Sequence, residues 1–163
     1  MSNTSDDAPI TVSSEHFSEN LFALLTETFE RTRGIYLDKD ADFFSTLAGL
    51  SAEQASRDVL GTSVAAQVFH AAFYIRALER YLGGFTGRTD WGESWTVQTV
   101  TEPEWNALQA QLREDYERAT GKLRAVTDWG EDQLDFGLPI VVHSAYHLGA
   151  VRQLVKAVRE EQG

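Results

Sequence analysis

The chain has 163 residues, 42% of them hydrophobic and 24% charged, which is the size and composition of a single globular domain with a buried core. It has no cysteine, which excludes disulfides, thiolate metal ligands and cysteine nucleophiles. Its formal net charge of −11, with no compensating run of Lys or Arg, argues against nucleic-acid binding, because that binding depends on neutralising phosphate groups.

The chain begins with a polar stretch. Residues 1–12 are rich in Ser and Asp, and we expect them to form a flexible tail ahead of one domain that spans residues 13–163. The opening residues lack the pattern of a signal peptide, and no apolar run approaches the roughly 20 residues that a membrane span requires. We therefore expect a soluble cytoplasmic protein that makes no membrane contact.

Four segments carry apolar residues at helical spacing, and each predicts an α-helix. They run from about 14 to 33, 63 to 82, 102 to 126 and 138 to 160. The inward stripes are Phe17, Leu21, Leu24, Leu25 and Thr28 in the first; Val64, Gln67, Ala71, Tyr74, Leu78 and Tyr81 in the second; Trp105, Leu108, Leu112, Tyr116, Ala119, Leu123 and Val126 in the third; and Ile140, His143, His147, Val151, Leu154 and Val158 in the fourth. In the second segment, Arg76, Glu79 and Arg80 fall on the opposite side, where we expect solvent.

Local residues mark where these helices begin and how they are joined. Thr101 and Glu104 form a capping box at the start of the third helix, and Pro103 sits in its first turn, where a missing N–H costs little. Residues 43–56 predict a short extra helix or two turns. The connection 83–101 is long for antiparallel neighbours, so it could run the length of the molecule and make the second and third helices parallel.

The helix count and lengths predict the fold class. Each segment has about 20 residues, which corresponds to about 30 Å of helix. Four helices of matched length, each with one apolar side, are typical of an all-α four-helix bundle. No alternating pattern of the kind that predicts β-strands competes with this interpretation.

Three of the four histidines lie on the predicted inward faces. His143 and His147 are four residues apart, so they project from the same side of the fourth helix, within its apolar stripe. His70 lies at the edge of the inward face of the second helix. His16, flanked by Glu15 and Glu19 in a first turn, is assigned to the surface without a function.

Three inward imidazoles predict a metal site. Burying a polar side chain without a partner costs a few kcal/mol, roughly, and one divalent cation would satisfy all three nitrogens. Two ligands on one helix and a third on a facing helix is a common way to build a metal site in a bundle, and three neutral ligands leave a coordination position open. The alternative is that the histidines are structural and form buried hydrogen bonds with Tyr74 and Tyr146.

Other patterns of catalytic residues are missing, including G-x-S-x-G, a phosphate loop, H-E-x-x-H and the Glu-x-x-His pairs of di-iron bundles. No residue stands out as a general base. Trp91 and Trp95 are most simply loop anchors, although they could line the mouth of a pocket. Gly149, in the middle of a helix, predicts the close approach of a neighbouring helix.

Two stretches resemble the DinB/YfiT-like superfamily, whose members are regarded as metal-dependent enzymes. They are "LAGLSAEQASRDVLGTSVAAQVFHAA" at 47–72 and "VVHSAYHLGAVRQ" at 141–153. The first resembles the family's lead-in to a helix with a histidine two turns in, and the second its closing H-x-x-x-H-x-G motif. Members often carry Gln directly after that glycine, where this chain has Ala150.

The resemblance implies further expectations. It implies a bundle of up-down-down-up order, and one divalent ion, zinc or nickel before iron or manganese, held by His70, His143 and His147. It also implies a homodimer, and the family's characterised branches include thiol transferases that use a low-molecular-weight thiol as cosubstrate and isomerases that act on maleylpyruvate.

Together these patterns predict a metal-dependent enzyme that carries out hydrolysis or thiol transfer on a small molecule. Gln67, Tyr74 and Tyr146 are candidates for contacts with the metal ligands or with substrate. The competing hypothesis is a non-catalytic bundle that binds a small molecule or takes part in a stress response, with structural histidines.

Overall fold

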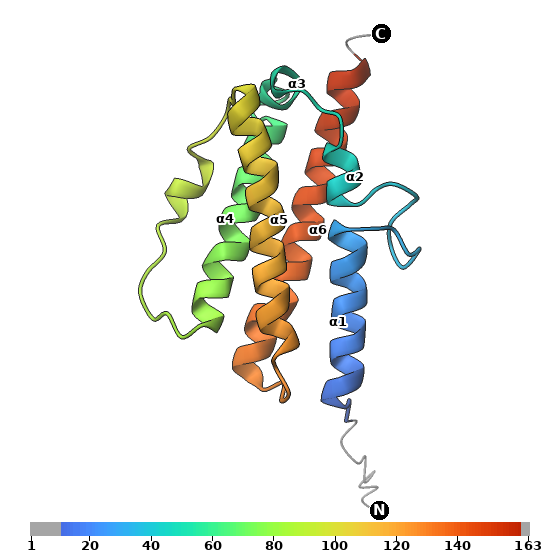
Figure 1. Cartoon of the computed structure of the whole chain (residues 1–163), viewed down its shortest axis with the longest axis vertical. Helices are drawn as coiled ribbons and strands as arrows, with labels where there is room; N and C mark the ends of the chain where they lie inside the picture. The colour runs from blue at the N-terminus through green and yellow to red at the C-terminus, as the bar shows by residue number, and fades with distance from the viewer. Residues whose placement is uncertain (1–10, 161–163) are drawn as a thin grey trace, which may run out of the picture.

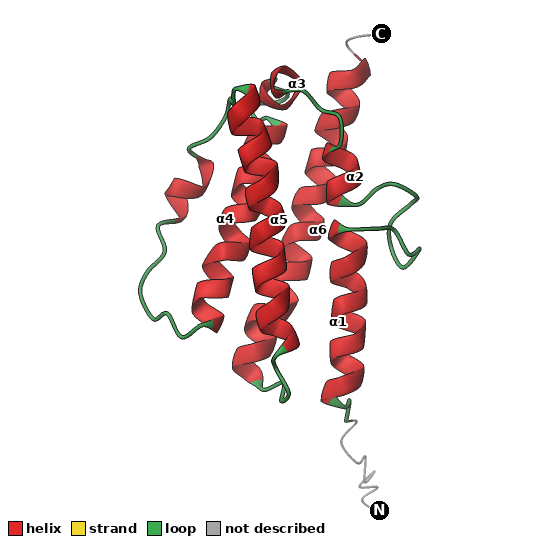
Figure 2. Ribbon diagram, viewed as in Figure 1, coloured by secondary structure: helices red, strands yellow, loops and turns green. Residues whose placement is uncertain are grey.

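The computed structural model describes residues 11–160, and within this range the chain is helical, with no β-strand (Figure 2). The elements are α1 (Ser14–Phe29), α2 (Phe43–Leu47), α3 (Ala52–Ser56), α4 (Val64–Leu82), the 3-10 helix η1 (Trp91–Trp95), α5 (Glu102–Arg124) and α6 (Glu131–Glu160). The predicted all-α class is therefore confirmed. The expected tail at 1–12 lies outside the described residues except for Thr11 and Val12. None of the described helices combines the length and the apolar character that a membrane crossing would require.

Polar caps fix the starts of α1, α4 and α5 close to where the sequence predicts them. The Ser13 hydroxyl accepts the His16 N–H at the start of α1, and the Ser63 hydroxyl accepts the Ala66 N–H at the start of α4. At the start of α5, the Glu104 carboxylate accepts the Thr101 N–H at 2.7 Å, as in the predicted capping box. Each bond satisfies a backbone or side-chain group that a helix end would otherwise leave without a partner.

Two predicted helix boundaries are wrong. The first helix ends at Phe29 and not near residue 33, because a loop follows in which Gly34 adopts a φ of +79°. The last helix begins at Glu131, seven residues before the predicted start, and continues through Pro139. A proline inside a helix removes one backbone hydrogen bond, so packing must stabilise the first two turns of α6.

Residues 43–56 form two short helices, α2 and α3. The carboxylate of Asp42 accepts the Ser45 N–H at 2.9 Å to start α2. Ser51 and Gln54 form a capping box around the start of α3. These two helices lie near the upper ends of α5 and α6 in Figure 1.

The long helices lie side by side with two directions of travel. In Figure 1 the chain rises along α1 and α6 and descends along α4 and α5. Contacts agree, since the pairs Arg76–Asp115 and Glu79–Arg118 keep a constant separation of 39 residues, as they must in helices that run the same way. The connection 83–101 returns along the outside of α4 to allow this, and Ser63 anchors it through a hydrogen bond to the Gln98 carbonyl at 2.6 Å.

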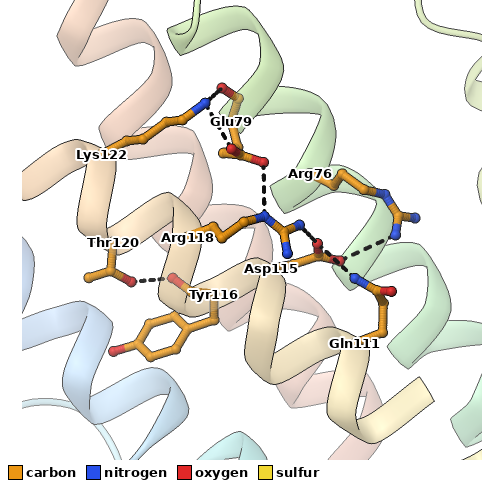
Figure 3. Close-up of polar contacts among 8 residues, drawn as sticks. All are labelled: Arg76, Glu79, Gln111, Asp115, Tyr116, Arg118, Thr120 and Lys122. Carbon is orange, nitrogen blue, oxygen red and sulfur yellow. Dashed lines mark hydrogen bonds and ion pairs between the residues drawn. The ribbon is translucent and has the colours of Figure 1, made fainter. Parts of the chain in front are cut away.

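A chain of ion pairs joins α4 to α5 (Figure 3). The fully buried carboxylate of Asp115 pairs with Arg76 and Arg118, and also accepts a hydrogen bond from Gln111. Glu79 pairs with Lys122 at 2.8 Å and with Arg118 at 3.6 Å. The expectation that Glu79 faces solvent is therefore wrong, because α4 packs against α5 on one side and α6 on another, so more than one stripe is buried.

The core has aromatic clusters at its contacts between helices. Phe29 lies between Phe43 and Tyr116, with ring centroids 5.2 and 4.4 Å away, and so ties α1 to α2 and α5. Trp105 is fully buried, and its indole N–H donates to the Leu50 carbonyl at 2.8 Å.

The close helix approach expected at Gly149 is wrong, since a Cβ there would have no neighbour within 4 Å. The glycine that does permit close packing is Gly137, one residue before the predicted start of α6. A Cβ at Gly137 would lie 2.8 Å from the ring of Trp129 and 3.3 Å from Leu21. Small size is therefore required where α6 meets α1.

Candidate metal centre

Three histidines from α4 and α6 converge on one point. His70 projects from α4, and His143 and His147 project from successive turns of α6, as their spacing predicts. One ring nitrogen from each lies within 4.8 Å of the other two. The Nε2 atoms of His70 and His143 are 3.1 Å apart. His70 and His147 are buried, and His143 is half-buried.

Ser94 fixes the orientation of the His70 ring. The Ser94 hydroxyl donates to the Trp91 carbonyl at 2.6 Å, so its oxygen is left to accept a hydrogen bond from Nδ1–H of His70 at 2.8 Å. The proton of neutral His70 is thereby assigned to Nδ1, and the lone pair is on Nε2, which faces the other histidines. Trp95 stacks on the same ring with the centroids 4.0 Å apart. The 3-10 helix η1 therefore supports His70 on two sides.

Gln67 fixes His147 in the same way. The Gln67 amide donates through Nε2 to the Thr62 hydroxyl at 3.1 Å, which orients its carbonyl oxygen toward the ring. That oxygen accepts Nδ1–H of His147 at 2.7 Å. Neutral His147 therefore carries its lone pair on Nε2. Two of the three imidazoles are thus preset to offer Nε2 to a shared partner.

His143 is held by stacking instead of a hydrogen bond. Its ring lies nearly parallel to that of Tyr74, with the centroids 3.5 Å apart and an angle of 6°. Among the described residues, its Nδ1 atom is buried and has no hydrogen-bond partner. Without a metal, Nε2–H of His143 would donate to Nε2 of His70, and Nδ1 would remain an unsatisfied acceptor.

All three imidazoles are neutral near pH 7. Burial lowers the pKa of His143 to about 3, helped by the charges that His147 and His70 would carry if protonated. Burial, together with His70, lowers the pKa of His147 to about 4. Burial also lowers the pKa of His70 below its usual 6.5. Neutral rings have free lone pairs, which is the state in which histidine binds metal ions.

The geometry fits a divalent metal ion. Two imidazole nitrogens bound to a tetrahedral zinc ion at about 2.0–2.1 Å lie about 3.3 Å apart, close to the 3.1 Å between His70 and His143. The separation of up to 4.8 Å within the group means that a small side-chain rotation is needed to bring all three nitrogens into one coordination sphere. Imidazole donors suit zinc, nickel, copper and iron. The three-histidine group can therefore hold a metal.

The other residues singled out in the sequence have different positions. Gln67 contacts His147 and Tyr74 contacts His143, both through the interactions given above. Tyr146 is 74% exposed and meets the His147 ring edge-on, with the centroids 5.0 Å apart. Among the described residues no hydrogen bond joins a tyrosine to a histidine, so the alternative of buried His–Tyr hydrogen bonds is not found. His16 is exposed, as expected.

Sequence reasoning missed Ser94. It lies in the long connection 83–101, where helical periodicity carries no information, and serine is too common to be noticed alone. Trp91 and Trp95 in "DWGESW" were the only indication, through the alternative that they line a pocket. Trp95 stacks on His70, and Trp91 packs against Tyr74 with the ring centroids 5.6 Å apart.

Compared with models of known protein families, with curated proteins and with solved structures, the chain gives no match.

Proposed function

We propose that this protein is a metal-dependent enzyme that binds one divalent ion through His70, His143 and His147 and acts on a small molecule by hydrolysis or thiol transfer. The observation that carries the proposal is the convergence of the three ring nitrogens within 4.8 Å. The hydrogen bonds from His70 to Ser94 and from His147 to Gln67 support it, because they leave both Nε2 lone pairs facing the cluster.

Zinc and nickel are the ions that we favour, ahead of iron and manganese. Such an ion, when bound with an open coordination position, lowers the pKa of a water or thiol and polarises a substrate oxygen. The chain's own residues orient the ligands: Ser94 and Gln67 hold two ring protons away from the centre, and Tyr74 supports His143 by stacking. Trp95 covers His70 and limits the access of water on that side.

We also propose that the four long helices form a four-helix bundle of up-down-down-up order and that the chain is a DinB/YfiT-like protein. The relative directions of three pairs of helices support the bundle. α4 and α5 run the same way, and α4 and α6 run in opposite directions, since Gln67 meets His147 whereas Tyr74 meets His143. α1 opposes α5, since Phe22 packs on Arg124 whereas Glu30 meets Tyr116. A homodimer and a low-molecular-weight thiol are parts of the same proposal.

Metal analysis of the untagged protein tests the site. We expect about one equivalent of zinc or nickel after reconstitution, measured by elemental analysis and by calorimetric titration. His143→Ala should lose stoichiometric metal binding and keep the far-ultraviolet helical signal. His143 is half-buried, its Nδ1 atom makes no hydrogen bond and its side chain caps no helix end, so the helices should form without it.

His16→Ala is the matched control, since His16 is an exposed histidine on α1 far from the cluster in the sequence. It should bind metal as the wild type does. Full metal retention in His143→Ala, or no binding and no stabilisation of the wild type by zinc or nickel, would contradict the proposal. The second result would favour a non-catalytic protein with structural histidines.

A further inference from the structure

Exposed apolar side chains gather around the three histidines. On α6, Leu138, Val142 and Tyr146 follow one another at intervals of four residues, so they share one side of the helix. They are 44%, 67% and 74% exposed. Trp91 and Trp95 of η1 are also exposed and contact Tyr74 and His70. In a protein of net charge −11, this concentration of apolar surface calls for an explanation.

Some of these apolar side chains line an open surface pocket beside the histidine cluster. It has a volume of about 460 Å³, and its walls are Tyr74, Leu138, Pro139, Val142, His143 and Tyr146. Pockets that bind small molecules usually have volumes of about 300–1,000 Å³. Among the described residues, no Asp, Glu, Lys or Arg side chain lines this pocket, although these four types make up 24% of the chain. His143 belongs both to the pocket wall and to the histidine cluster.

We propose that this pocket binds the neutral aryl or alkyl part of the substrate and directs the substrate's polar end toward the histidines; the inference rests on the proposed metal-dependent function. A phosphate or carboxylate in this pocket would lie mostly against apolar side chains, with no Lys or Arg among the described lining residues to pair with it. An apolar group gains by leaving water, and the aromatic rings of Tyr74 and Tyr146 offer it flat surfaces.

The position of the pocket favours a small molecule over a second protein. His143 lines the pocket and is itself a proposed metal ligand, so a compound with one polar group could reach the metal and occupy the pocket at once. The substrate class that follows is a neutral compound with an aryl or branched alkyl group next to the bond that reacts.

Three hydroxamates test this inference, because they share one metal-binding group and differ in the tail. Acetohydroxamate has a methyl tail, benzohydroxamate a phenyl tail and succinic monohydroxamate a carboxylate tail. With zinc-loaded protein, calorimetry should give a dissociation constant for the phenyl compound that is lower than that of the methyl compound by about tenfold or more. The carboxylate compound should bind no better than the methyl compound.

Val142→Glu, loaded with zinc to the same content as the wild type, should lose the affinity advantage of the phenyl tail over the methyl tail. Val142 is exposed, so the substitution places a carboxylate at the pocket without disturbing the core. Leu60→Glu is the matched control, because Leu60 is fully exposed and lies outside the pocket. Equal affinity for the phenyl and methyl compounds in a metal-loaded wild type would overturn the inference and leave the proposed function intact. The inference would also be overturned if the wild type is a dimer, Val142→Glu is a monomer, and the phenyl compound binds no more tightly than the methyl compound.

If the wild type binds no metal, the proposed function is overturned, and the pocket is then tested in the metal-free protein. Benzamide has the same ring and no chelating group, and it can be titrated into the metal-free protein under nuclear magnetic resonance. Saturable shifts of the Val142 and Tyr146 signals in the wild type, with no shift of the Tyr146 signal in Val142→Glu, support a neutral aryl pocket. The absence of such shifts in the wild type overturns it.

Discussion

At the scale of single residues, the proposed metal site depends on side chains that are not themselves candidate ligands. The Nδ1–H of His70 and that of His147 each have one acceptor, Ser94 and Gln67. An imidazole can bind a metal through Nε2 only if its proton stays on Nδ1, so these acceptors favour the binding-competent tautomer. His143 lacks such an acceptor and relies on Tyr74 stacking, which makes it the least constrained of the three.

We predict that Ser94→Ala weakens zinc binding by about 10- to 100-fold, because Nδ1–H of His70 then has no acceptor in a buried position. Competition with a chelator of known affinity measures the change. Thr96→Ala is the control, since Thr96 lies in the same segment and its hydroxyl donates to the Glu93 carbonyl, away from the histidines. Equal affinities in the two variants would show that Ser94 does not position His70.

At the scale of helices, the start of α6 shows how a neighbouring element extends a helix. Trp129 packs on Phe17 with the ring centroids 4.8 Å apart, and its indole N–H donates to the Ser18 hydroxyl at 2.6 Å. Gly137 gives this ring room. Packing against α1 therefore stabilises the two helical turns that precede Pro139. The local sequence alone predicts that the helix begins only after these two turns.

Two glycines of α6 should respond in opposite directions to the same substitution. Gly137→Ala should lower the free energy of unfolding by about 1–2 kcal/mol, because the added methyl meets the ring of Trp129, which its hydrogen bond holds in place. Gly149→Ala should raise it by about 0.5–1 kcal/mol, since the new Cβ contacts nothing and alanine favours the helix.

Urea denaturation of both variants and the wild type measures these changes. Because the two substitutions are chemically identical and lie on one helix, helix propensity cancels in the comparison. If Gly137→Ala has a higher free energy of unfolding than the wild type, the contact between α1 and α6 can adjust to the added methyl group. Tight packing would then not explain why residue 137 is glycine.

At the scale of the whole molecule, the connections between helices contribute to stability as well as the helices themselves. The carboxylate of Glu27, fully buried on α1, accepts the backbone N–H groups of Ile35, Tyr36 and Leu37 at 2.8–3.0 Å. This closes the loop that leads from α1 to α2. Burial by itself would raise the pKa of Glu27, but these hydrogen bonds outweigh it, so its pKa lies below the usual 4.5.

The sign of this shift predicts the pH dependence of stability. A carboxylate whose pKa is lower in the folded state stabilises the fold above its unfolded pKa, and the contribution is lost as the pH falls through the folded value. Glu27→Gln should therefore cost about 1–3 kcal/mol at pH 7, and the difference from the wild type should shrink as the pH falls below about 4.5.

Urea denaturation at pH 7 and in steps down to pH 3 checks this expectation. Glu19→Gln is the control, because Glu19 is an exposed carboxylate on the same helix, and it should change stability little at any pH. A cost of Glu27→Gln that stays constant across the range would mean that the charge of the carboxylate does not matter.

The sequence by itself determined the helices and the histidines. Helical periodicity is a local property, so α1, α4 and α5 could be placed within a few residues, and the four-residue spacing of His143 and His147 fixed their shared side. That His70 would face them followed from a burial pattern on a separate helix.

The tertiary structure alone decided which further surfaces are buried and which residues complete the site. α4 packs on two neighbours, so Glu79 is buried against Lys122, which one stripe per helix could not predict. Ser94 reaches His70 from 24 residues away along an irregular connection. Such contacts depend on how the helices and their connections pack in three dimensions. They join residues that are far apart in the sequence, so no periodic pattern of residues predicts them.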